Sequence, residues 1–133
     1  MSTFNDSTPG PGGNIEIDAV QTAPVSVGIL VYVSGPVLGM AARVAPIDIL
    51  DINKMPGIGI VTAVLTPATC TVLLWGVYQQ AGAFTPNARY WAGAAQTPTI
   101  TIPAGPGEII QAVGQAIDEN RLMFKPEIMM GQN

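Results

Sequence analysis

Short runs of β-forming residues, each ended by a turn that contains glycine or proline, constrain this sequence more than any other feature. Segments rich in Val, Ile, Thr and aromatic residues recur along the chain at short intervals. No long segment keeps a 3.6-residue apolar period with helix caps, so we expect helix to be minor. The 15 glycines and 12 prolines agree with this pattern, because turns and bulges use both residue types. The sequence therefore predicts an all-β fold, a small β-barrel or sandwich of about eight to ten short strands.

The individual strands are predicted from alternation and from composition. Residues 15–20 and 98–103 alternate apolar and polar side chains with period two, which indicates half-buried strands. Composition predicts further strands, in chain order, at 25–33, 37–44, 58–65, 70–80, 88–92, 108–117 and 121–125. Gly- and Pro-containing turns are expected at 34–36, 55–57 and 104–107.

Two connecting regions, 46–54 and 118–120, lie between predicted strands. Residues 118–120 (Asp-Glu-Asn) are predicted to form a three-residue loop between the last two strands, which makes them a hairpin. Residues 46–54 fit a strand edge or a short helix equally well, and both alternatives stay open.

Glycine recurs inside apolar segments, at Gly28, Gly59, Gly76 and Gly114. Glycine weakens a strand unless the strand bends or another part of the chain approaches closely. Four such positions favour sharply coiled strands that close a small barrel. The alternative is that a β protein simply tolerates some glycine.

The first 14 residues differ in composition from the rest. Residues 1–14 are rich in Ser, Thr, Asn, Gly and Pro, and they offer little apolar surface to offset the entropy of ordering. We expect a flexible N-terminal arm that is disordered in an isolated subunit. In an assembly the arm is expected to order against a neighbour, with Phe4 as an anchor. Residues 15–133 suit a single domain of ordinary size.

The charge content points to protein partners. Only 11% of the residues are charged and 48% are hydrophobic, whereas about 25% charged residues is usual. Such a surface exposes wide neutral or apolar areas, which tend to mark interfaces, so we expect it to be covered by other copies of the chain or by another protein. The five Lys and Arg residues are scattered and the net charge is −4, which argues against nucleic-acid binding.

The remaining sequence features concern compartment and covalent chemistry. Cys70 is the only cysteine, so no disulfide within the chain is available, and its apolar surroundings suggest a buried, inert thiol. The longest apolar stretch, 25–42, is interrupted by Gly, Ser and Pro and does not resemble a membrane-spanning helix. The N-terminus lacks the order of a signal peptide. We therefore expect assembly in a cytoplasm, with no membrane partner.

Catalytic residues are not evident in this sequence. Histidine is absent, which removes the commonest general base and the usual zinc ligand. Asp48 and Asp51 are the nearest to a carboxylate pair, but a solvated polar edge explains them better than acid–base chemistry. Trp75, Tyr90 and Trp91 are able to stack on a sugar in principle, yet they lie in predicted strands, where aromatic residues normally fill the core. We expect a non-enzymatic protein without a cofactor or metal.

Candidate contact residues lie near both ends of the chain. At the C-terminus, Met129 and Met130 are adaptable side chains suited either to an interface or to the domain's own core. Strand edges and the arm can supply backbone pairing to neighbours. The residues predicted to contact other chains are Phe4, Ile15, Ile17, Met129 and Met130.

The sequence also resembles a known module over most of residues 25–126. The residues that carry the resemblance are Val27–Ser34, Thr85–Gly93, Thr99–Pro103, Glu108–Ala116 and Arg121–Pro126. An aromatic pair followed by Gly, a Thr-rich strand, Pro, and then apolar-Gln-x-Val-Gly-x-Ala is similar to the module of tailed-bacteriophage capsid decoration, or cement, proteins and of some phage tail proteins. Gln111, Gly28 and Gly114 match the pattern, Trp91 departs from it, and the arm lies outside the match.

The resemblance implies a β-barrel-like virion subunit, usually a homotrimer. Such a subunit sits on the capsid exterior, where major capsid proteins meet, and reinforces the shell against internal genome pressure. A phage tail, fibre or baseplate component built on the same module is the nearest alternative. A carbohydrate-binding module that uses Trp75, Tyr90 or Trp91 is a third, and a small hydrolase that uses Asp48 and Asp51 is a fourth.

Overall fold

A computed structural model describes residues 13–38 and 41–133, and it confirms the all-β prediction. Its strands are β1 (Ile15–Gln21), β2 (Leu30–Leu38), β3 (Ala41–Pro46), β4 (Gly59–Thr66), β5 (Thr69–Gln79), β6 (Arg89–Ala92), β7 (Pro98–Thr99), β8 (Ile109–Ile110), β9 (Ala112–Asp118), β10 (Arg121–Phe124) and β11 (Gly131–Gln132). Within the described residues a short 3-10 helix, η2 (Ile52–Lys54), lies between β3 and β4. The region 46–54, which the sequence left open, therefore contains a helical turn.

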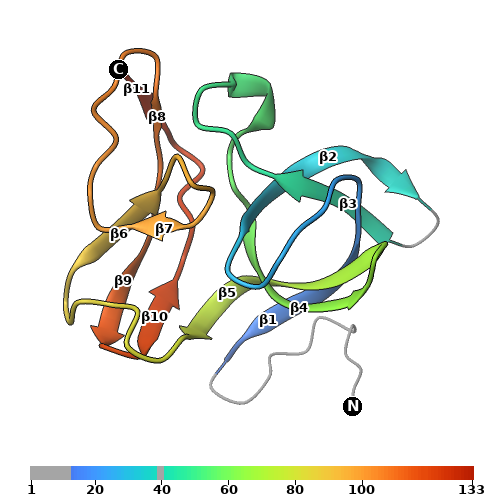
Figure 1. The fold of residues 1–133 in the computed structure, drawn as a ribbon, viewed down its shortest axis with the longest axis horizontal. Coiled ribbons are helices and arrows are strands. Elements are labelled where there is room, and N and C mark those ends of the chain that lie inside the picture. Colours follow the sequence, from blue (N-terminus) through green and yellow to red (C-terminus); the bar gives the residue numbers. More distant parts are fainter. Residues whose placement is uncertain (1–12, 39–40) are drawn as a thin grey trace.

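The first five strands close into a barrel. Their order is β1-β3-β2-β4-β5, and β5 pairs back onto β1, so the ring is complete. All neighbours are antiparallel except β1 and β3. In Figure 1 these strands form the right half of the molecule, from blue to green. The paired segment between β2 and β4 is short: Leu30 pairs with Ile60, and Val31 pairs with Gly59.

Small and β-branched side chains fill the barrel. The interior cluster consists of Ala19, Val31, Val44, Val61, Cys70 and Val72. Their neighbours Leu30, Ile60 and Leu73 belong to a different cluster outside the ring. This division follows from the period-two geometry of strands, which sends successive side chains to opposite faces. A five-stranded ring leaves room only for side chains of this size.

Strand β5 continues beyond the barrel into a second sheet, with the order β5-β10-β9-β6-β7. It pairs with β1 as far as Trp75 and with β10 from Gly76 onward. At this change of partner Gly76 has a φ of 133°, which side chains rarely tolerate. The amide of Asn14 takes the place of a strand partner, since it accepts from the Val77 N–H at 2.8 Å and donates to the Val77 carbonyl at 3.2 Å.

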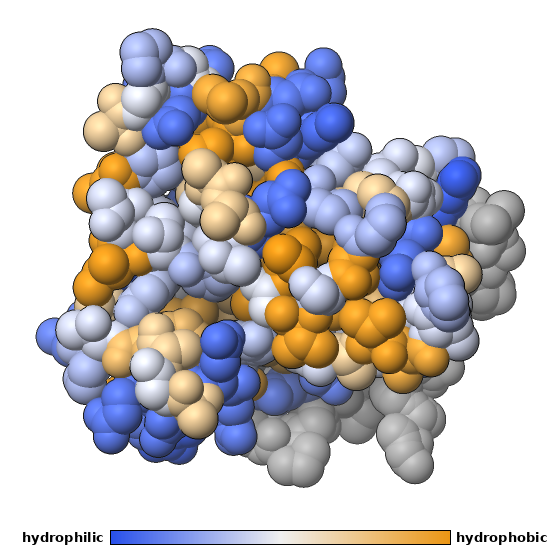
Figure 2. Space-filling model, in the orientation of Figure 1, coloured by the Kyte–Doolittle hydropathy of each residue, from blue (hydrophilic) through white to orange (hydrophobic). Residues whose placement is uncertain are grey.

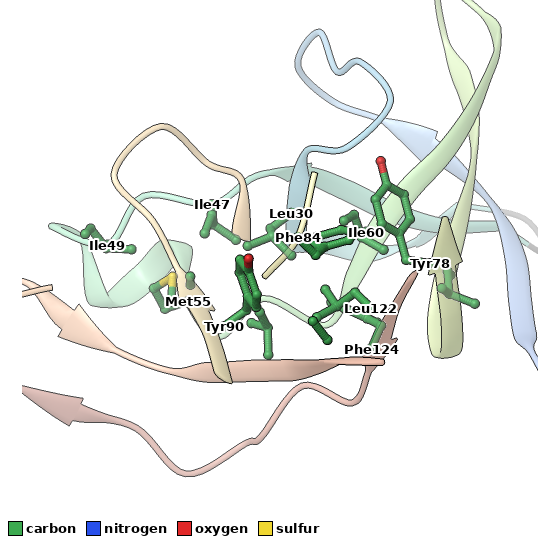
Figure 3. Close-up of a cluster of buried hydrophobic side chains, with 14 of the residues drawn as sticks. Leu30, Ile47, Ile49, Met55, Ile60, Tyr78, Phe84, Tyr90, Leu122 and Phe124 are labelled. Carbon is green, nitrogen blue, oxygen red and sulfur yellow. The ribbon is translucent and has the colours of Figure 1, made fainter. Parts of the chain in front are cut away.

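The larger core cluster joins the barrel to the second sheet. Figure 3 shows Leu30 and Ile60 from the barrel close to Leu122 and Phe124 from β10. Phe84 lies between two tyrosines in edge-to-face contacts, with its ring centroid 6.2 Å from Tyr78 and 5.3 Å from Tyr90. Edge-to-face geometry is favoured by the ring quadrupoles. The other buried members of this cluster are Ile47, Ile49, Met55, Leu73, Ala92, Ile109, Val113 and Ala116.

A buried glutamine holds the 47–58 loop against the second sheet. Gln111 is 1% exposed. Its Oε1 accepts from the Gly57 N–H at 2.9 Å, and its Nε2 donates to the carbonyls of Gly57 at 2.8 Å and Glu127 at 2.7 Å. One side chain therefore joins the loop to the C-terminal segment.

Several predicted local elements are wrong, among them the strand predicted at 25–33, which begins only at Leu30. The turn expected at 34–36 is absent, because β2 runs through it with register shifts between Val33 and Gly35 and again before Leu38. Bulges of this kind absorb Gly and Pro without ending a strand. The strand expected over 98–103 pairs only at Pro98 and Thr99, since no described strand lies opposite the rest.

Candidate interaction surfaces

Large apolar side chains that reach solvent are the most unusual surface feature of the described residues. Single exposed apolar residues are normal, so only their grouping carries information. One group lies on the barrel and consists of Val27, Val64 and Leu65, which are 57%, 42% and 53% exposed. A second group lies at the opposite end of the fold, around η2 and the C-terminal segment.

The first group, here called the barrel patch, is formed by β4 and the loop that precedes β2. The Gly28 N–H donates to the Val61 carbonyl, and the Val61 N–H donates to the Ile29 carbonyl, both at 2.9 Å. These bonds hold Val27 beside the strand that carries Val64 and Leu65. The space-filling view in Figure 2 shows apolar side chains gathered over the barrel.

The barrel patch lies in a long uncharged part of the sequence. From Met55 to Ala88 there is no Asp, Glu, Lys or Arg, and β4 and β5 both fall within it. Exposed strands in monomeric proteins are usually protected by charges. The absence of charge next to exposed Val and Leu is therefore typical of a surface that another protein covers.

Strand β4 offers its side chains to a partner, and not a regular row of free backbone hydrogen-bonding groups. Beyond Val61 no described strand pairs with its outer edge, but its pairing with β5 shifts register between Val61 and Ala63 and between Val64 and Thr66. Bulges twist a strand and interrupt its regular row of hydrogen-bonding groups. The same shift near Thr66 explains why the neighbours Val64 and Leu65 are both exposed.

The second group includes the two most exposed large apolar side chains of the described residues, Ile128 at 81% and Met129 at 87%. We call this pair the terminal knob. The Glu127 N–H donates to the Ala112 carbonyl at 2.9 Å on one side of it. On the other side Gly131 pairs with Ile110, where β11 meets β8. The knob is therefore held on both flanks by backbone pairing.

A hollow of about 270 Å³ lies at the same end of the fold. Its walls are mainly apolar and include Ile49, Ile102, Pro103 and Ala104. The one carboxylate on its rim, Glu108, accepts from the Gly105 N–H at 2.8 Å. We call this feature the rim hollow.

The 3-10 turn beside the hollow exposes Leu50 at 64% and Ile52 at 56%. The two aspartates of this loop bond to the backbone locally: Asp48 accepts from the Leu50 N–H and Asp51 from the Asn53 N–H, each at 2.9 Å. Such bonds stabilise turns. They give both carboxylates a structural role in this loop.

The five predicted contact residues have different environments. Phe4 lies outside the described residues. Ile15 is half-buried opposite Trp75, and Ile17 is half-buried against the interior cluster of the barrel. Met130 packs against the larger core, whereas Met129 is exposed. Of the four that the structure describes, only Met129 projects freely into solvent.

Sequence reasoning missed most of the exposed apolar residues. Ile128 had a usable signal, because three large apolar residues in succession after Glu127 cannot all turn inward from an extended segment. Val64 and Leu65 had none, since their common exposure depends on a register shift. Leu50 and Ile52 lie in the region whose structure the sequence left open.

The aromatic residues are arranged poorly for stacking on a sugar. Tyr90 is 5% exposed, and its hydroxyl accepts from the Thr85 N–H at 2.8 Å. Trp91 is half-buried and has the Arg89 guanidinium 5.6 Å from its ring centroid, in cation–π range. Trp75, 38% exposed, lies within β5 opposite Ile15, where the pairing of β5 with β1 ends. No coplanar exposed pair is formed by these three rings.

The pKa shifts of the titratable groups have structural causes. Burial, and then the nearby Asp18 charge, raises the pKa of the Cys70 thiol, which disfavours the reactive thiolate. Burial also raises the pKa of Tyr78. At the surface, a hydrogen bond from Arg121 is the main reason why the pKa of Asp118 is lowered. None of these groups lies in the barrel patch, the terminal knob or the rim hollow.

In the described part of the chain, no three Asp, Glu or Cys side chains gather in a way that would hold a metal ion. Nor does any helix in residues 13–38 and 41–133 have the length and apolar character needed to cross a membrane. Comparisons of the chain with protein-family models, with curated proteins and with solved structures found no match.

Proposed function

We propose that the protein is a structural, non-enzymatic subunit of a tailed-phage virion that decorates the outside of the capsid and stabilises the shell. The observation that carries the proposal is the barrel patch, where Val27, Val64 and Leu65 are exposed beside an uncharged sequence. A surface of this kind loses unfavourable contact with water when a protein covers it. The module resemblance supplies the identity of the covering protein, the major capsid protein.

The mechanism follows from linkage. A subunit that binds the assembled lattice, and not its dissociated components, stabilises the lattice by mass action, about 2.7 kcal/mol per site when its free concentration is 100 times Kd. If several copies act as one unit, their simultaneous contacts add avidity. The protein then needs no chemistry of its own, only a rigid scaffold with exposed apolar contacts.

The test is binding to capsid shells that lack the subunit. The wild-type protein is expected to sediment with such shells at a fixed stoichiometry and to raise their melting temperature. Leu65→Lys places a charge in the barrel patch and is expected to weaken binding by about 10-fold or more. Ile117→Lys is the matched control, because Ile117 is also exposed, at 46%, but lies on β9 outside the patch.

The outcomes separate this proposal from its alternatives. Binding to purified tails, but not to shells, would move the protein to the tail or fibre. A tryptophan fluorescence change on adding glycans, without shell binding, would favour a carbohydrate-binding module. Equal shell binding by Leu65→Lys and wild type would show that the barrel patch does not face the capsid.

A further inference from the structure

We propose that a small hollow on the outer face of the second sheet binds one carboxylate, an Asp or Glu side chain of the protein that this subunit decorates. The identity of that protein rests on the proposed function, whereas the bound group and its binding residues are assigned by the hollow itself. The hollow has a volume of about 230 Å³, and the side chains of Arg89, Lys125, Glu127, Gln115 and Met123 line it. We call it the basic hollow.

Strand pairing brings three of these side chains to one face of the sheet. Arg89 on β6 lies opposite Gln115 on β9, and Gln115 lies opposite Met123 on β10. Tyr90 and Phe124, the next residues along β6 and β10, are buried in the larger core. Because successive side chains of a strand point to opposite faces, Arg89 and Met123 point away from that core.

The segment that follows β10 forms the remaining wall, and its backbone is fixed. The Lys125 N–H donates to the Val113 carbonyl at 2.8 Å, and the Glu127 N–H donates to the Ala112 carbonyl at 2.9 Å. The Glu127 carbonyl also accepts from the side-chain amide of the buried Gln111 at 2.7 Å. Both charged side chains therefore start from a backbone that does not have to be ordered when a ligand binds.

The Arg89 guanidinium is held from two sides and keeps free donors. Its Nη2 donates to Glu127 Oε2 at 3.0 Å, and its central carbon lies 5.6 Å from the centroid of the Trp91 ring, in cation–π range. A guanidinium has several N–H donors in a fixed fork, and no other hydrogen bond joins this one to the described residues. The free side of such a fork matches the two oxygens of a carboxylate.

The charge balance of the basic hollow favours a single carboxylate. Arg89 is paired with Glu127, whereas Lys125 has no ion pair among the described residues. The hollow therefore carries one uncompensated positive charge, in a chain whose net charge is −4. One carboxylate neutralises that charge. An apolar side chain in the same place would remove water from the Lys125 ammonium without giving it a partner, which is costly.

A protein surface is the source of carboxylate that suits this hollow. The side chains of Arg89 and Glu127 are 61% and 50% exposed, and an ion pair that is open to water contributes little. A small free carboxylate would therefore bind weakly. A protein that covers the sheet excludes water and strengthens the pair. Charge complementarity of this kind fixes the orientation of two proteins more than it adds affinity, while the barrel patch supplies the apolar contact.

The experiment compares Lys125→Gln with the matched control Lys54→Gln. Both variants lose one exposed positive charge, but Lys54 belongs to η2, outside the basic hollow. Binding to capsid shells that lack the subunit is measured by sedimentation, from about 0.05 M to about 0.5 M salt. At low salt Lys125→Gln is expected to bind about 10-fold more weakly than wild type, with a smaller dependence on salt. Lys54→Gln is expected to bind like wild type.

Glu127→Gln tests the sign of the effect. Removing this carboxylate releases Arg89 from its partner and raises the positive charge of the hollow, so binding at low salt is expected to tighten by about 3-fold. Damage to the fold would weaken binding instead, and circular dichroism checks the fold of each variant.

Amidation of the exposed carboxylates of the shells, with carbodiimide and glycinamide, tests the chemistry of the partner. The difference between wild type and Lys125→Gln is expected to vanish on amidated shells. A difference that persists there would overturn the inference, as would equal binding of Lys125→Gln and Lys54→Gln to untreated shells. In both cases wild-type binding to shells leaves the proposed function standing, whereas absence of wild-type binding overturns the proposed function itself.

Discussion

Replacing Gln111 by Leu tests how the loop over residues 47–58 is held to the rest of the fold. The wild-type side chain donates or accepts three hydrogen bonds and is buried to 1% exposure. Leucine has a similar volume, fits an apolar site and can make none of these bonds. The change therefore removes the hydrogen bonds without creating a large cavity.

The expected cost follows from the groups that lose their partner. The N–H and the carbonyl of Gly57 are buried and have Gln111 as their partner, whereas the Glu127 carbonyl lies nearer to solvent and can bind water. An unsatisfied buried backbone group costs about 1–3 kcal/mol. Two such groups, with a partial gain from burying leucine, give a loss of about 3 kcal/mol in the free energy of unfolding. For a domain of this size the melting temperature should fall by about 10 °C.

Gln111→Glu adds a prediction about pH. A carboxylate at this position still accepts from the Gly57 N–H, but its second oxygen faces the carbonyls of Gly57 and Glu127, which are acceptors. Burial and these acceptors favour the protonated acid, so the pKa of the new side chain is raised in the folded state. The folded protein then binds more protons than the unfolded chain, and the variant loses stability as pH rises from 4 to 7.

The assay is urea unfolding followed by tryptophan fluorescence at pH 7, with the pH series added for the glutamate variant. Gln115→Leu is the matched control on β9. Gln115 also makes two hydrogen bonds, both to Asn87, but it is exposed, so it should cost well under 1 kcal/mol. If Gln111→Leu unfolds at the same urea concentration as wild type, the reasoning about Gly57 is refuted.

Three further predictions concern other parts of the fold. Cys70 is fully buried and its pKa is raised, so a thiol reagent should label the native protein at least about 100-fold more slowly than the urea-unfolded chain; equal rates would contradict the buried barrel interior. Gly76→Ala should cost about 2 kcal/mol in unfolding free energy, because φ is positive and a Cβ would contact the Asn14 side chain; Gly82→Ala, also at positive φ but in open space, should cost about half as much. The pKa of Asp118 is lowered by Arg121, so the Asp118→Asn variant should be less stable than wild type at neutral pH. The difference in unfolding free energy should vanish as pH falls through the lowered pKa. A constant difference from pH 7 to pH 2 would show that the charge of Asp118 does not stabilise the fold.

Local sequence signals predicted the strands that depend on local chemistry. Alternation placed the first strand at 15–20, and β1 spans Ile15–Gln21. Turn composition at 118–120 predicted the last hairpin; in the structure Asp118 pairs with Arg121 across a register shift, which leaves a loop of two residues. Glycine inside an apolar run predicted a sharp bend, and Gly76 lies where β5 passes from the barrel to the second sheet.

These local signals could not predict which strands pair when they are far apart in the sequence. The sequence does not reveal that β1 lies between β3 and β5, or that β5 changes partner at Gly76. Predicting the interaction surfaces would have required the same information on strand pairing. Ile17 was predicted as a contact residue, but its packing on the barrel interior is decided by ring closure. Leu65 is exposed next to Val64 because of a register shift that strict alternation does not contain.

Ring closure also has a consequence for the speed of folding. The barrel is complete only when β1 pairs with β5, which joins Ile17 to Val72 across most of the N-terminal half of the chain. Distant pairings form slowly, because the entropy of closing the loop must be met first. The β4–β5 hairpin is local and should form early, and it lies within the uncharged sequence between Met55 and Ala88. Refolding yield should therefore fall steeply with chain concentration, since early hairpins on different molecules meet before each ring has closed.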